Sequence, residues 1–87
     1  MSPARILSTE ECDVLHALLH PSGDPADRTA ARLARRLAAG PDEVTRTLQA
    51  LERNSPRLVE PCFDEEMGLQ LWRVTADGED AYEHSCE

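Results

Sequence analysis

Residues 29–59 constrain the fold of this chain more than any other stretch, reading TAARLARRLAAGPDEVTRTLQALERNSPRLV. Its first part has apolar residues at i, i+3, i+4 and i+7, the spacing of a helix with one buried side: Ala30, Leu33, Ala34 and Leu37. Gly40 is expected to end this helix, because glycine adopts the left-handed conformation without steric cost. Pro41 then begins another helix at a position where a missing N–H does no harm.

This second helix is expected from Pro41 to Arg53, with Val44, Leu48 and Leu51 on its apolar side. Two short amphipathic helices joined by a turn that contains glycine form a helix-turn-helix unit. Where such a unit binds DNA, its second helix enters the major groove. Residues 41–53 are therefore a candidate recognition helix, and its predicted exposed side carries Asp42, Thr45, Arg46, Gln49 and Arg53.

The residues before this unit predict one further helix. Ser8 followed by Glu11 fits a capping box, so a helix is expected from Thr9 to His20. The residues expected to point inward from it are Val14, Leu15, Leu18 and Leu19. Residues 21–27, PSGDPAD, have turn composition, and Asp27 or Thr29 is expected to cap the helix that follows.

The residues after the unit predict a β-hairpin. Two extended runs, RLVEPCF and LQLWRV, flank the acidic, glycine-containing turn DEEMG. Trp72 and Val74 share one face of the second run, while Leu69 and Leu71 lie on the other face with Arg73. A hairpin that is apolar on both faces suggests either a partner that covers one face or cover from the chain's own ends. TADGEDAYE predicts a turn and a short polar helix, and the tail HSCE is expected to fray.

Charge is distributed unevenly along the 87 residues, whose net charge is −8. Residues 28–57 carry seven arginines against three acidic residues, a local net charge of +4, whereas residues 58–87 have a net charge of −8. At short range a local basic patch matters more to a polyanion than net charge does, because salt screens fields beyond about 8–10 Å. The distribution therefore favours the helix-turn-helix as an anion-facing surface, although a solvated helix face would carry similar residues.

The cysteines and the hydropathy of the chain indicate its cellular location. Cys12, Cys62 and Cys86 are scattered and odd in number, which favours reduced thiols in a cytoplasmic protein. No eighteen-residue apolar run predicts a membrane span, and MSPARIL does not have the apolar region of a secretory signal. We expect a single domain over residues 1–87, with its core at about 8–83.

The order of the predicted elements, with LARRLAAGPDEVTRTLQALERNSPRLVE in the middle and WRVTADGEDAYE near the end, resembles the winged helix-turn-helix transcriptional regulators of the MarR-like and PadR-like families. Val74-Thr75-Ala76-Asp77-Gly78 resembles the end of their wing and the start of the next helix. The resemblance implies an α+β, mainly α fold: three helices, a β-hairpin wing and a short C-terminal helix. It also implies binding of double-stranded DNA and regulation of transcription.

Carried over position by position, the resemblance implies two sets of DNA-binding residues. Base edges would be read from the third helix by Thr45, Arg46 and Gln49. Candidates for phosphate contact are Arg28, Arg32, Arg35 and Arg36, and also Arg53 and Arg57. Residues 64–66, in the turn of the predicted wing, are acidic where a DNA-contacting wing offers Arg or Lys. A single module of this size makes too little contact for tight specific binding, so a repressor of this kind is expected to dimerise.

The sequence also allows three alternatives. A winged helix can act as a protein–protein interaction module, here through the acidic hairpin and the C-terminal third. Cys12, His16 and His20 suggest metal ligands, but Cys12 and His20 are eight residues, about 12 Å, apart along a helix and cannot share one ion without help from elsewhere. No spacing places a nucleophile beside a base, so we expect neither an enzyme nor a cofactor.

Overall fold

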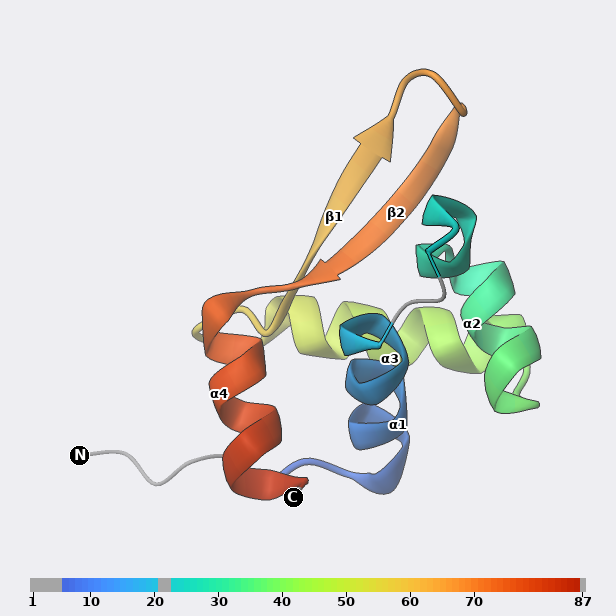
Figure 1. Cartoon of the computed structure of the whole chain (residues 1–87). Helices are drawn as coiled ribbons and strands as arrows, with labels where there is room; N and C mark the ends of the chain where they lie inside the picture. Colours follow the sequence, from blue (N-terminus) through green and yellow to red (C-terminus); the bar gives the residue numbers. More distant parts are fainter. Residues whose placement is uncertain (1–5, 21–22, 87) are drawn as a thin grey trace.

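The computed structural model describes residues 6–20 and 23–86. Over these ranges it contains four α-helices, one 3-10 helix and one antiparallel hairpin. Their bounds in chain order are α1 Thr9–Leu19, η1 Pro25–Arg28, α2 Ala30–Leu37, α3 Pro41–Arg53, β1 Val59–Asp64, β2 Leu69–Val74 and α4 Ala76–Ser85. The helices gather around α1, and the hairpin projects away from them as an arm (Figure 1). The predicted mainly helical α+β fold and its order of elements are confirmed.

The core is aliphatic because the chain has only three aromatic residues. Its largest fully buried side chains come from α1, α2, α3 and β1: Leu15, Leu33, Leu48, Leu51, Val14 and Val59. Trp72 is buried against them from β2, whereas Tyr82 is half-buried and Phe63 is exposed. On α1 the predicted inward position Leu19 is only half-buried, and Ala17 is buried instead. No helix in the described ranges is long and apolar enough to cross a membrane.

The start of α1 matches the predicted capping box. The Ser8 hydroxyl accepts a hydrogen bond from the Glu11 N–H, and the Glu11 carboxylate accepts one from the Ser8 N–H. Both bonds satisfy N–H groups that a helix start leaves free. The helix ends at Leu19, one residue earlier than predicted, with His20 as its C-cap.

The turn between α2 and α3 differs from the prediction. Thr29 caps α2, as one of the two predicted alternatives, by accepting a hydrogen bond from the Arg32 N–H. The helix ends at Leu37, and its C-cap Ala38 adopts the left-handed conformation with φ 54° and ψ 41°. The assignment of that role to Gly40 is wrong, because Gly40 is extended with φ −72° and is the N-cap of α3. The bounds of α3 and its buried residues, Val44, Leu48 and Leu51, are confirmed.

The hairpin pairs β1 and β2 in antiparallel register, with Val59 opposite Val74 and Asp64 opposite Leu69. Trp72 reaches the core from one face, and Val74 packs against the core beside it. On the other face Arg73 pairs with the carboxylate of Glu60, its cross-strand partner. The prediction of two extended runs around residues 64–68 is therefore confirmed.

The chain passes from β2 into α4 without the turn that we predicted. Thr75 is the N-cap of α4, and its hydroxyl accepts a hydrogen bond from the Gly78 N–H while donating one to the carbonyl of Arg57. The Thr75 N–H donates to the carbonyl of Leu58. One residue thus joins the start of α4 to the segment that leads into β1.

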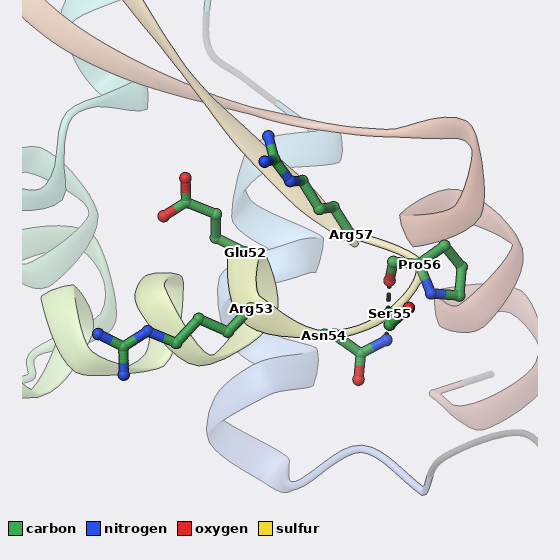
Figure 2. A pocket seen from close by; sticks show the side chains of 6 residues that line it. All are labelled: Glu52, Arg53, Asn54, Ser55, Pro56 and Arg57. Carbon is green, nitrogen blue, oxygen red and sulfur yellow. Dashed lines mark hydrogen bonds between the residues drawn. The ribbon is translucent and has the colours of Figure 1, made fainter.

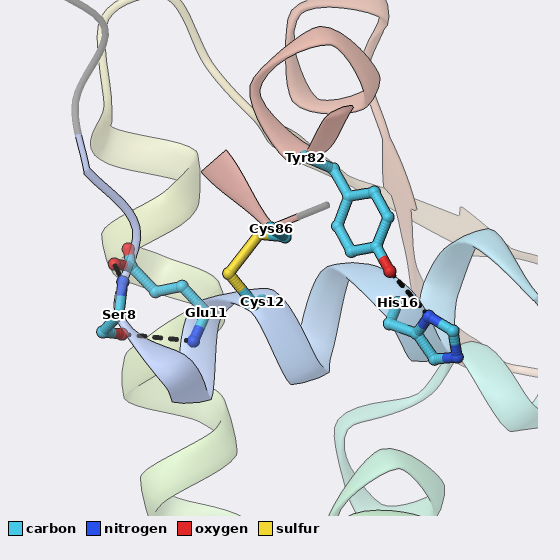
Figure 3. Close-up of a disulfide and its surroundings, with 6 residues drawn as sticks. All are labelled: Ser8, Glu11, Cys12, His16, Tyr82 and Cys86. Carbon is cyan, nitrogen blue, oxygen red and sulfur yellow. Dashed lines mark hydrogen bonds between the residues drawn. A yellow bond between two sulfur atoms is a disulfide. The ribbon is translucent and has the colours of Figure 1, made fainter. Parts of the chain in front are cut away.

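The described part of the C-terminal tail, residues 84–86, is tied to α1 rather than frayed, and Glu87 lies outside the described residues. Cys86 caps α4 and forms a disulfide with Cys12, with the two Cα atoms 5.7 Å apart (Figure 3). One turn away along each helix, the His16 ring and the Tyr82 hydroxyl share a hydrogen bond of 2.7 Å. The prediction of reduced thiols is therefore wrong for Cys12 and Cys86, and only Cys62 is a free cysteine in the part of the chain described. The pairing places together two cysteines that lie 74 positions apart in sequence.

Candidate nucleic-acid interface

The predicted phosphate-binding arginines of α2 lie together at the surface. Arg32, Arg35 and Arg36 are exposed and, with Asp27, line a hollow of about 370 Å³. Their spacing explains this, since residues three and four apart share a side of a helix. The opposite side of α2 is buried through Leu33 and Ala34. The arginine side of α2 is thus fixed in orientation by the core.

Two of these three arginines also make contacts within the chain. Arg32 lies 3.7 Å from the Asp27 carboxylate, in an ion pair whose arginine side chain remains half-exposed. The Arg36 guanidinium donates a hydrogen bond of 3.1 Å to the carbonyl of Ala17 on α1. Arg35 makes neither kind of contact with any residue in the ranges 6–20 and 23–86. Of the three, Arg35 has the guanidinium most available to an external anion.

On α3 the predicted base-reading residues follow the exposed side of the helix. Arg46 and Gln49 are exposed, and Thr45 is half-buried. Asp42 and Glu43 are exposed in the first turn, where the helix dipole stabilises acidic side chains. Those two carboxylates would repel phosphate from the N-terminal end of α3. The middle and the C-terminal end of the helix are therefore its anion-compatible part.

The arginines do not all converge on one place. Arg53 lies at the C-terminal end of α3, away from α2, where it lines a second hollow of about 590 Å³ (Figure 2). Arg57 lines the same hollow from the segment that follows the cis peptide bond between Ser55 and Pro56. The resemblance also implied Arg57, together with Arg53, as a candidate for phosphate contact. The two side chains line the same hollow but point in different directions (Figure 2).

Arg28 is set apart from the other arginines by its element. It ends η1 and lines a small hollow of about 140 Å³ with Gly23, Asp24 and Pro25. Among the described residues, the seven arginines at 28–57 include one ion pair, that of Arg32. The basic segment therefore remains largely unneutralised in the fold, although its charges cover η1, α2 and both the middle and the end of α3.

The alternative metal site is not assembled. Cys12 is bonded to Cys86, so its sulfur is not available as a thiolate ligand. The His16 and His20 rings do lie close together, tilted at 48° with their centroids 4.6 Å apart. No group of three or more His, Cys, Asp or Glu side chains that could hold an ion was found within the described ranges.

A pair of short helices joined by a turn, followed by a projecting hairpin and a closing helix, defines the winged helix-turn-helix fold. Solved structures of MarR-family regulators share this fold. The MepR–DNA complex of S. aureus superposes with a TM-score of 0.77 and 21% identity, covering 92% of this chain and 55% of MepR. The zinc-responsive MarR family member ZitR of Lactococcus lactis gives 0.64 and 25%, covering 98% of this chain and 55% of ZitR.

A third similar structure is the PcaV transcriptional regulator of Streptomyces coelicolor, with a TM-score of 0.77 and 18% identity over 92% of this chain and 53% of PcaV. The chain thus spans about half the length of the regulators that it resembles. No family model and no curated protein matches its sequence. The resemblance to the MarR-like fold is confirmed at the level of structure.

Proposed function

We propose that this chain binds double-stranded DNA as a winged-helix transcriptional regulator, with α3 in the major groove. The observation that carries the proposal is the exposed arginine side of the α2–α3 pair in an otherwise acidic chain. The fold similarity to MepR, which was solved bound to DNA, supports a DNA-facing role for the α2–α3 pair. The proposal includes a cytoplasmic location and no enzymatic activity, and the Cys12–Cys86 disulfide gives that location no support.

The proposed roles follow from exposure and from intramolecular contacts. Arg46 and Gln49 read base edges, because arginine and glutamine make bidentate contacts to guanine and adenine. Arg35 contacts a phosphate directly, since no partner in the described ranges competes for it. Arg32 and Arg36 contribute less, because each must release or share an intramolecular contact. Thr45, Arg28 and Arg53 are proposed as peripheral contacts to the same duplex.

The test is fluorescence anisotropy with a mixed-sequence duplex, titrated over a series of salt concentrations. Each lost phosphate contact lowers the slope of log K against log salt by about 1. We expect Arg35→Ala to reduce both the affinity and this slope, and Arg46→Ala to reduce affinity strongly on a selected target site. Arg73→Ala is the matched control, because it removes one positive charge that Glu60 already pairs.

Two outcomes would contradict the proposal. One is no duplex affinity at low salt in the parent protein. The other is an equal loss in all three variants, which would reflect net charge alone. The first outcome would favour the alternative function, a protein–protein interaction module, which the exposed acidic wing tip also supports.

A further inference from the structure

The tip of the hairpin combines negative charge with exposed apolar side chains. Phe63 is 62% exposed and Met67 is 41% exposed, and Glu65 and Glu66 lie between them on the surface. Isolated exposed apolar residues are common, but here an aromatic residue, a methionine and two carboxylates are exposed within five residues at the end of the hairpin. We call residues 63–67 the wing tip.

The wing tip is held in one conformation by its own turn. The Gly68 N–H donates a hydrogen bond of 2.8 Å to the Asp64 carbonyl, and the Met67 N–H donates one of 3.1 Å to the Asp64 carboxylate. Gly68 has φ 65°, a conformation that glycine adopts without strain. A partner that binds this turn would therefore lose little conformational entropy in ordering it. The hairpin also projects beyond the helices, so that its tip is free to enter a neighbouring molecule (Figure 1).

The chain itself carries a surface complementary to this tip. We call the exposed arginines Arg32 and Arg35 of α2 and Arg46 of α3 the α2–α3 surface; Arg32 and Arg35 line one hollow on α2. Arginine guanidinium groups pair with carboxylates and stack on aromatic rings. Within one chain, however, no ion pair in the described ranges joins the wing-tip carboxylates to these arginines. In those ranges Arg35 and the carboxylates of Glu65 and Glu66 have no ion-pair partner, whereas Arg32 would exchange Asp27 for an external carboxylate.

We propose that the wing tip of one copy docks on the α2–α3 surface of a second copy, and that the second copy returns the same contact. Glu65 and Glu66 would face Arg32 and Arg35, and Phe63 would pack against an arginine side chain. A two-fold arrangement makes each contact twice and closes, whereas a one-way contact would extend into a filament. The net charges, +4 over residues 28–57 and −8 over residues 58–87, favour this pairing over tip-to-tip contact.

The dimer would cover the surface that we propose for DNA. Dimer and duplex would then exclude each other, with the acidic tip in the place of phosphate. Only this consequence rests on the proposed function, because the dimer itself requires no DNA. The two ideas therefore fail separately.

The experiment is sedimentation equilibrium in a Cys62→Ser background, which removes the exposed thiol without a reductant that would open the Cys12–Cys86 bond. We expect reversible dimers at roughly 20 mM salt and weaker association at roughly 500 mM, because salt screens exposed charges. Glu65→Arg/Glu66→Arg and Arg32→Glu/Arg35→Glu should each weaken dimerisation by about tenfold or more.

The decisive arm mixes these two charge-reversed variants in equal amounts. In the mixture each tip meets a surface of opposite charge, so a heterodimer should form with near-parental affinity. Glu79→Arg/Glu83→Arg, on exposed residues of α4, makes the same change in net charge and should leave the parent's dimer intact.

Circular dichroism melting curves that match the parent's would show that these exposed substitutions preserve the fold. A parent that stays monomeric at low salt, a dimer that survives both reversals, or a mixture that does not associate would each overturn the proposal. If the α4 variant weakened association as much as the tip variant, net charge rather than docking would be responsible, and the proposal would again fail.

Discussion

The carbonyl oxygen of Leu58 lies where a side chain on residue 78 would have to stand. A Cβ placed on Gly78 would be 2.0 Å from that oxygen and 2.6 Å from the Val74 Cγ1 atom. Gly78 therefore sits in the first turn of α4 because the helix crosses the backbone before β1 at contact distance. The absence of a side chain at Gly78 allows α4 to pack directly against the backbone that leads into the wing.

Gly78→Ala should accordingly destabilise the fold by about 2–4 kcal/mol, because backbone must shift to accept the methyl group. Urea unfolding followed by circular dichroism measures the change. Glu79→Ala, one residue along on the exposed side of α4, should change stability by only about 0.5 kcal/mol. Equal effects for the two variants would mean that α4 moves away from Leu58 without cost.

The Thr75 hydroxyl should be worth about 1–2 kcal/mol, because it caps α4 and bonds the Arg57 carbonyl at the same time. Thr75→Ala removes both bonds, and Thr75→Ser should restore most of the loss. Thr47→Ala is the comparison, since the Thr47 hydroxyl bonds only the Glu43 carbonyl within its own helix. Failure of serine to rescue stability would assign the effect to the methyl group instead.

Opening the Cys12–Cys86 bond should lower stability by about 4 kcal/mol in the chain-entropy estimate, because the bond closes most of the chain into one loop. A Cys12→Ser/Cys86→Ser variant, or the parent in reductant, should melt at a lower temperature. Cys62→Ser should melt as the parent does. A melting temperature that does not respond to reductant would show that the packing of α1 against α4 suffices alone.

Ala38→Gly should stabilise the protein by about 1 kcal/mol, because a residue with a Cβ is strained in the left-handed conformation. Ala31→Gly, the same change on the exposed side of α2, should destabilise by about the same amount. Chemical denaturation of both variants gives two effects of opposite sign. Destabilisation by Ala38→Gly would contradict the assigned end of α2.

The pKa of His84 is raised above its ordinary value, first by its hydrogen bond to the Asp80 carbonyl and then by the Asp80 carboxylate. The folded state thus favours the protonated ring. The contribution of His84 to stability is fully present below the pKa that its ring has in the unfolded chain. It is lost as the pH rises through the higher pKa of the ring in the folded protein. NMR titration should find the raised value, and Asp80→Asn should lower it in part, because the carbonyl remains. A pKa at or below the ordinary value would contradict the contact.

The sequence by itself determined the local elements. The bounds of α3, the Ser8–Glu11 capping box and the hairpin around residues 64–68 follow from patterns within a few residues of each other, which is the range over which helix periodicity and turn chemistry act. The positions of the exposed arginines on α2 follow in the same way. Their roles in DNA binding remain predictions.

Only the tertiary structure decided which distant groups meet. It paired Cys12 with Cys86, gave the left-handed helix end to Ala38 rather than Gly40, placed Arg36 on the Ala17 carbonyl, and fitted Gly78 against Leu58. The disulfide, the Arg36 hydrogen bond and the Gly78 contact join segments far apart in the chain. The left-handed conformation of Ala38 depends on how the chain turns from α2 into α3. Such relationships depend on the packing of the whole core, which no local spacing encodes.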